Sequence, residues 1–174
     1  MKAIVIATMA LLFLVSCKSF NTNSTSKNID NISLIIYNSD VVDFNNKAFN
    51  KNDIYSTFPL KKNDTFSIEF MHSVNRSPVV EYYKFDDNND IYVYKTIYYN
   101  FGAGVPTEIT GNERLTYGDD GSIIIDNIDK KIDNLTYYLS NIYDHVLKIN
   151  DKYPISLWDV CGKNKIITIK IINN

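Results

Sequence analysis

The sequence predicts an all-β protein, an antiparallel β-sandwich or partly closed barrel of about eight to ten short strands in a single domain. Short segments rich in Val, Ile, Tyr and Phe recur along the chain, and several alternate apolar with polar side chains, the period of a strand with one buried face. Asn, Asp, Gly and Pro separate these segments at short intervals, so the pattern does not support a series of βαβ units.

The first 17 residues are predicted to be a signal peptide and not part of the fold. Residues 3–15 are almost entirely apolar and follow Lys2, a run shorter than the ~20 residues of a membrane-spanning helix. The ending LVSC at residues 14–17 resembles the lipobox of bacterial lipoproteins, in which the cysteine becomes the lipid-bearing N-terminus. We therefore expect lipidation at Cys17 and a secreted, membrane-anchored lipoprotein on the periplasmic or cell-surface side. The alternative is an ordinary signal peptide with a chance cysteine.

Residues 18–31 are rich in Ser, Thr, Asn and Lys and are predicted to be a flexible linker. At about 5–6 Å times the square root of its length, this linker would hold the domain roughly 20 Å from the membrane. Residues 32–174 are expected to form one β domain. If Cys17 carries lipid, Cys161 has no partner within the chain, and we expect no structural disulfide.

Strands of the β domain are expected, in chain order, at residues 32–37, 41–44, 54–58, 66–71, 79–85, 91–99, 122–126 and 165–172. Residues 44–53 carry a weak signal for a short helix. Residues 128–146 are ambiguous, because their apolar residues recur at helical spacing while Thr and Tyr at 135–139 and the alternation at 145–149 favour strands. We prefer strands here and leave the helix open.

The hairpin formed by residues 66–85 carries the first candidate site. If its strands pair so that Phe70 faces Glu81, His72 continues the apolar face and lies one diagonal from Glu81. The plain interpretation is a buried, hydrogen-bonded pair, since a polar group on an apolar face needs a partner. The functional alternatives are a general base oriented by the carboxylate, or a metal site completed by His145.

Several further residues are ligand-binding candidates, and none is a predicted catalytic residue. Ser73 lies beside His72 without a nucleophile-elbow motif, and Arg76 is either a solvated turn residue or a contact for a carboxylate ligand. Gly102, Gly104 and Pro106 indicate a shaped loop or a lip over a ligand pocket. Because the third glycine of a dinucleotide-binding loop is missing, we expect no cofactor.

The charge balance gives no reason to expect a nucleic-acid partner. The chain has 18 Lys and Arg against 20 Asp and Glu, a formal net charge of −2. A basic patch is the electrostatic signature of nucleic-acid binding, and this composition does not supply one.

The order of the motifs resembles a bacterial and archaeal family catalogued as domain of unknown function 1850. The residues that carry this resemblance are HSV at 72–74, Pro78, Glu81, GAG at 102–104, Pro106, DG at 120–121 and His145. It covers about residues 32–172, and Asn75 stands where many members have an acid. Genes of this family often accompany those of TRAP transporters of the TAXI type, and the family brings no established activity.

Three functions from different classes follow. The first is a non-enzymatic, lipid-anchored, extracytoplasmic accessory or binding module that contacts a TRAP permease or solute-binding component, or holds a small solute. The second is a metal-binding protein that uses His72, Glu81 and His145. The third is a structural envelope lipoprotein.

Overall fold

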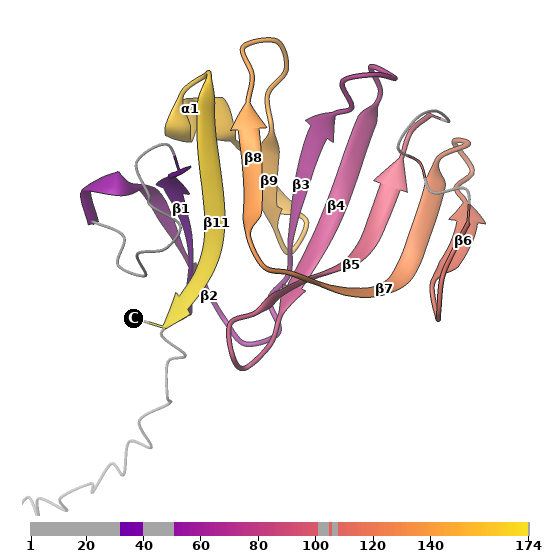
Figure 1. Cartoon of the computed structure of the whole chain (residues 1–174), viewed down its shortest axis with the longest axis horizontal. Helices are drawn as coiled ribbons and strands as arrows, with labels where there is room; N and C mark the ends of the chain where they lie inside the picture. Colours follow the sequence, from indigo (N-terminus) through magenta and orange to yellow (C-terminus); the bar gives the residue numbers. More distant parts are fainter. Residues whose placement is uncertain (1–31, 40–50, 101–104, 106–107, 174) are drawn as a thin grey trace, which may run out of the picture.

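The computed structural model describes residues 32–39, 51–100, 105 and 108–173. Within these residues, eleven strands form two antiparallel sheets (Figure 1). The four-stranded sheet has the order β2 (Ile54–Leu60), β1 (Ile32–Asn38), β11 (Lys165–Asn173), β8 (Leu135–Leu139). The seven-stranded sheet has the order β10 (Lys152–Ser156), β9 (Val146–Ile149), β3 (Phe66–Met71), β4 (Pro78–Phe85), β5 (Ile91–Tyr98), β7 (Ile123–Ile132), β6 (Arg114–Tyr117). The predicted all-β, sandwich-like single domain is confirmed, and the described strands do not close into a barrel.

One hydrophobic core lies between the two sheets. Alternate residues of most strands point into it, as the period of two requires. The small sheet contributes Leu34, Ile36, Leu60, Leu135, Leu139, Ile167, Ile169 and Ile171. The large sheet contributes Phe66, Ile68, Tyr83, Ile91, Val93 and Leu147. The core therefore holds together strands that are far apart in the sequence.

A short helix, α1 (Leu157–Cys161), closes one end of this core. Ser156 caps it by accepting a hydrogen bond from the backbone N–H of Asp159 at 3.1 Å, the usual role of a serine at this position. Leu157 and Cys161 are buried in the core. Burial raises the pKa of the Cys161 thiol to about 12, so this cysteine is a core residue and not a reactive thiol.

The ambiguous segment at residues 128–146 is strand, as preferred, and the helical alternative is wrong. Its residues belong to the end of β7, to β8, to the loop at 140–145 and to the start of β9. Residues 41–44 lie outside the described part, and of the weak helix at 44–53 the structure describes one turn of 3-10 helix, η2 (Lys51–Asp53). None of the described helices is long and apolar enough to span a membrane.

The two ends of the sandwich differ in what they carry. Ile32, where the described domain begins, lies opposite Asn173 at the end marked by the C-terminus in Figure 1. Lys165, at the other end of β11, lies opposite Leu139, where the loop at 140–145 starts. The loop at 72–77 is its neighbour, because β3 and β9 pair side by side. These two loops are therefore at the end opposite to Ile32.

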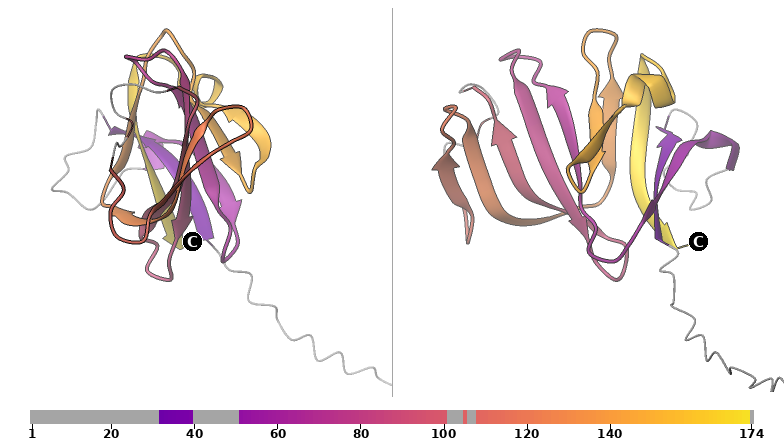
Figure 2. Two further views of the ribbon diagram at one scale, coloured as in Figure 1. Left: turned by 90° about the vertical axis from the view of Figure 1, so that its right-hand side faces the viewer. Right: turned by 180° about the vertical axis from the view of Figure 1, so that it is seen from behind.

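The seven-stranded sheet is wider than the sheet that covers it. Figure 1 shows β7 and β6 at the side of the molecule away from β1 and β2, and the rear view in Figure 2 shows the same separation. No residue of β6 belongs to the buried core cluster between the sheets. The large sheet thus has a covered region, which faces the small sheet, and an overhanging region, which is formed by β7 and β6.

Candidate functional site

The hairpin of β3 and β4 forms as predicted, with a different register. Phe70 lies opposite Val79 and not opposite Glu81, whose partner is Ile68. The last pair before the turn is Met71 with Pro78, so six residues form the connection. Because side chains alternate along a strand, this shift of two residues keeps Glu81 on the core-facing side while changing its neighbours.

His72 lies beyond the last pair of the hairpin, and the predicted pairing with Glu81 is wrong. Its backbone N–H donates to the Ser77 carbonyl at 2.9 Å, and its carbonyl accepts from the Arg76 N–H at 2.9 Å. Its ring nitrogen Nδ1 accepts from the N–H groups of Val74 at 3.3 Å and Asn75 at 3.4 Å. The imidazole therefore organises the turn and does not extend the apolar face.

The other two candidates of this turn are exposed. Ser73 is a turn residue, and Arg76 adopts a left-handed backbone conformation with φ 48°. No ion pair joins Arg76 to an acid among the described residues. Its guanidinium is thus open to a ligand or partner, as the sequence allowed.

Glu81 belongs to a polar cluster with two tyrosines. The Tyr83 hydroxyl donates to Glu81 Oε2 at 2.6 Å, and the Tyr137 hydroxyl donates to the same oxygen at 2.7 Å. The two hydroxyl oxygens lie 2.7 Å apart. Tyr83 follows Glu81 by two residues in β4, whereas Tyr137 comes from β8 in the opposite sheet. The cluster therefore connects the two sheets through hydrogen bonds.

The electrostatics of the cluster keep both tyrosines protonated. Burial raises the pKa of Tyr83 far above its ordinary value, and the Glu81 carboxylate raises it further. Burial is also the main cause that raises the pKa of Tyr137, and the nearby Tyr83 and Glu81 raise it further. Hydrogen bonds to a charged acceptor are the stronger kind. Two neutral donors thus satisfy the carboxylate without the desolvation of a second charge.

His145 borders this cluster on the side of α1. Its ring stacks on Phe70 at 5.7 Å between centroids and meets the edge of Tyr137 at 5.5 Å. Its Nδ1 atom is buried and has no hydrogen-bond partner within the described structure. Burial lowers the pKa of His145, against the opposing effect of Asp144. The imidazole is therefore held in its neutral form at neutral pH.

The three proposed metal ligands do not come together. Among the described residues, no group of three or more His, Cys, Asp and Glu side chains is placed to hold a metal ion. His72 serves the turn, Glu81 accepts two tyrosine hydroxyls and His145 packs on aromatic rings. In the described structure, His72, Glu81 and His145 therefore do not form the proposed metal site.

Four candidate residues lie outside the part of the chain that the structure describes. They are the lipidation site Cys17 and the loop residues Gly102, Gly104 and Pro106. Their proposed roles stay predictions.

The contacts of the cluster connect the two sheets. Glu81 Oε2 accepts two hydrogen bonds, which tie this oxygen to the two tyrosines. The tyrosines have pKa values too high to act as nucleophiles near neutral pH. The arrangement joins β4 to β8 and fixes the aromatic wall formed by Phe70 and His145.

Sequence reasoning missed the two tyrosines that matter most. The position of Tyr83 could have been predicted, because Tyr83 follows Glu81 by two residues in one strand and therefore lies on the same face. The position of Tyr137 could not, since its contact with Glu81 depends on how the two sheets pack.

Fold and cluster together define a two-sheet β-sandwich protein whose sheets are joined by a half-buried acid and two tyrosines. The chain belongs to the family described as Domain of unknown function (DUF1850), whose model matches residues 66–155, more than half of the chain. The matched segment runs from β3 into β10 and contains Glu81, Tyr83, Tyr137 and His145. No curated protein and no solved structure matches the chain.

Proposed function

We propose that this chain is a non-enzymatic, lipid-anchored binding or accessory module on the extracytoplasmic side of a membrane, working beside a TRAP-type transporter of the TAXI class. The observation that carries the non-enzymatic part is the engagement of Glu81 by Tyr83 and Tyr137, which uses the acid to join two sheets. The anchor is supported by the LVSC ending at residues 14–17 and by the polar linker that follows it.

The placement of the loops supports contact with a protein partner at the end remote from the anchor. The linker would enter the domain at Ile32, while the loops at 72–77 and 140–145 lie at the opposite end. Val74 and Ile142 expose 67% and 70% of their surface there, and Tyr143 is also exposed. Apolar and aromatic side chains of this kind are typical anchors of protein interfaces. On this proposal, the loop end faces away from the lipid surface and toward the partner.

Co-purification from native membranes tests this function. The full chain, carrying a C-terminal affinity tag, is expected to fractionate with membranes and to recover a TRAP transporter component after mild cross-linking. Cys17→Ala should release it from the membrane fraction, because the lipid is the proposed anchor.

A matched pair of variants tests the loop end itself. Ile142→Asp should abolish the cross-link, since it places a charge in the centre of the proposed interface. Tyr153→Asp is the control, because Tyr153 is 85% exposed and lies on β10 outside the two loops. Loss of the cross-link in both variants would contradict the placement. Recovery of no transporter component, together with no stabilising solute in thermal-shift screens, would overturn the function and leave a structural envelope lipoprotein.

A further inference from the structure

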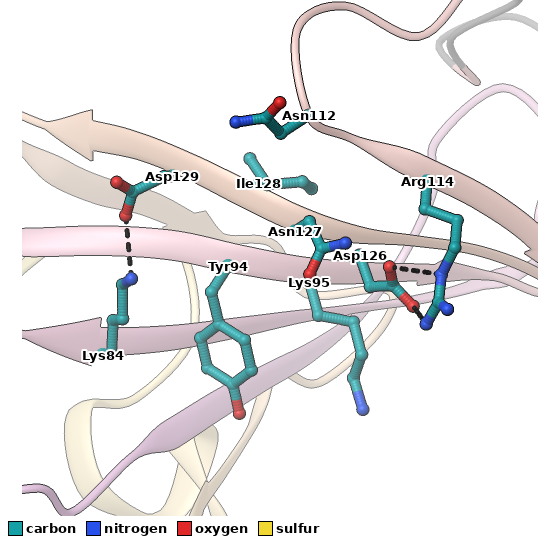
Figure 3. Close-up of a pocket in the computed structure, with 9 residues that line it drawn as sticks. All are labelled: Lys84, Tyr94, Lys95, Asn112, Arg114, Asp126, Asn127, Ile128 and Asp129. Atoms are coloured by element: carbon teal, nitrogen blue, oxygen red, sulfur yellow. Dashed lines mark hydrogen bonds and ion pairs between the residues drawn. The ribbon is translucent and has the colours of Figure 1, made fainter.

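A hollow of about 560 Å³ lies on the large sheet (Figure 3). It is on the face that points away from the small sheet. Tyr83 points into the core, so its neighbour Lys84, which lines the hollow, points to the outer face. A volume of this size is within the range of small-molecule sites, about 300–1,000 Å³. The hollow lies over strands β4, β5, β7 and β6 and next to the overhanging edge of the sheet.

An irregularity shared by two strands produces this hollow. Val93 pairs with Lys130 and Lys95 pairs with Asp126, so the single residue Tyr94 of β5 faces residues 127–129 of β7. Asn127 adopts a left-handed conformation with φ 58°, which asparagine tolerates better than most residues. Bulges of this kind bend a sheet and redirect side chains, and they are frequent beside functional sites. Tyr94 and residues 127–129, which lie at this irregularity, all line the hollow.

The charged side chains of the hollow form two groups, as Figure 3 shows. At one end, the Arg114 guanidinium donates two hydrogen bonds to Asp126, at 3.0 and 2.8 Å, while Lys95 lies across from Asp126 on the other neighbouring strand. At the other end, Lys84 pairs with Asp129 at 2.8 Å. Three cationic and two acidic side chains line the space, which leaves one positive charge in excess.

The excess charge belongs to Lys95. Its ammonium lies 3.9 Å from the centroid of the Tyr82 ring, a cation–π contact, and forms no ion pair with a described acid. The Tyr94 hydroxyl and the side-chain amides of Asn112 and Asn127 also line the hollow. The hollow therefore offers a lysine that forms no ion pair among the described residues, together with polar groups from Tyr94, Asn112 and Asn127.

From this geometry we infer that the hollow binds a small organic anion, with a carboxylate bound by Lys95 and the open edge of the Arg114 guanidinium. Charge-assisted hydrogen bonds from Lys and Arg are the strong contacts available to a carboxylate. Tyr94 and Asn127 bind hydroxyl or carbonyl groups of the same ligand. The inference rests on the proposed function, of which it specifies the solute-holding role.

Isothermal titration calorimetry of the full chain in detergent, at low ionic strength, tests the inference. Succinate and citrate are the probes, and succinamide is the neutral analogue. We expect the two anions to bind and succinamide to give no measurable heat. Lys95→Gln should weaken anion binding about tenfold, the worth of one charge-assisted contact. Asp126→Asn should strengthen it several-fold, because it removes a repelling carboxylate and frees Arg114.

Lys148→Gln is the matched control. Lys148 also lies on the outer face of the large sheet, where it pairs with Glu69 at 3.2 Å, and its removal should change the affinity less than about twofold. Thermal unfolding of each variant checks that it is folded. The inference is overturned if no anion binds, if succinamide binds equally well, or if Lys95→Gln and Lys148→Gln behave alike. Such a result leaves membrane anchoring and partner recovery as they are, so it is distinguishable from failure of the proposed function.

Discussion

Two carboxylates on the large sheet show how its covered and overhanging regions differ. Glu81 faces the small sheet and accepts hydrogen bonds from two neutral tyrosines. Asp126 faces outward and pairs with the guanidinium of Arg114. Between the sheets, the neutral tyrosine donors of Glu81 avoid burying a second charge, which would be costly to desolvate. On the outer face, water screens the ion pair of Asp126 with Arg114, and the surface around this pair stays open.

The two regions differ in what their polar groups bind. In the covered region, the polar groups of Glu81, Tyr83 and Tyr137 bind one another and hold the two sheets together. On the outer face beside the overhanging strands, the irregular pairing of β5 with β7 and Lys95, which forms no ion pair among the described residues, leave polar groups available. Stability should therefore depend on the first region, and ligand binding on the second.

The largest effect on stability is expected from removing the hydroxyl groups of Tyr83 and Tyr137. Tyr83→Phe combined with Tyr137→Phe leaves the Glu81 carboxylate without its donors while preserving the aromatic packing. The free energy of unfolding should fall by about 2–4 kcal/mol, because a buried polar group without partners costs about 1–3 kcal/mol and a charged one costs more. Denaturant unfolding of the full chain measures it.

A third substitution provides the control for that variant. Adding Glu81→Leu removes the stranded carboxylate and should restore much of the lost stability. If the double tyrosine variant unfolds like the original chain, the cluster is not a significant link between the sheets.

A smaller effect is expected from pH, through His145. Burial lowers the pKa of His145 in the folded state, so the unfolded chain binds more protons than the folded chain as pH falls below about 6.5. Stability should be fully present above that pH and should decrease as the solution is acidified toward pH 5. His145→Phe should flatten this part of the profile, measured by thermal unfolding. A profile with the same slope in both proteins would contradict the burial of the imidazole.

The smallest effect is expected at the exposed ion pair. Arg114→Gln should leave the unfolding midpoint nearly unchanged, because exposed ion pairs add little to stability, while anion binding in the hollow should weaken. Parallel denaturation and calorimetry separate the two readouts. A loss of stability comparable to that of the tyrosine variant would remove the distinction between the regions.

Much of the fold was predictable from the sequence, because the period of two and the turn residues act locally. The strands of the central hairpin, the long strand β5 and the closing strand β11 all lie close to their predicted bounds. The face of Glu81 was also predictable, since a register error of two residues does not change it.

The site itself was only partly predictable, for two physical reasons. The pairing of the hairpin depends on a six-residue turn held by His72, and no local pattern indicates how such a turn closes. The contact between Glu81 and Tyr137 depends on the packing of two sheets whose residues are distant in sequence. The hollow escaped prediction because it arises from bulges, which alternation along one strand does not reveal.

A double-mutant cycle between Glu81 and Tyr137 tests most directly whether the acid links the two sheets. Glu81→Leu, Tyr137→Phe and the combined variant are unfolded in denaturant, and the coupling free energy is taken from the four stabilities. We predict that the single changes are not additive, with a coupling of about 1–2 kcal/mol. Additive effects within about 0.3 kcal/mol would show that the two residues act independently and would contradict the link.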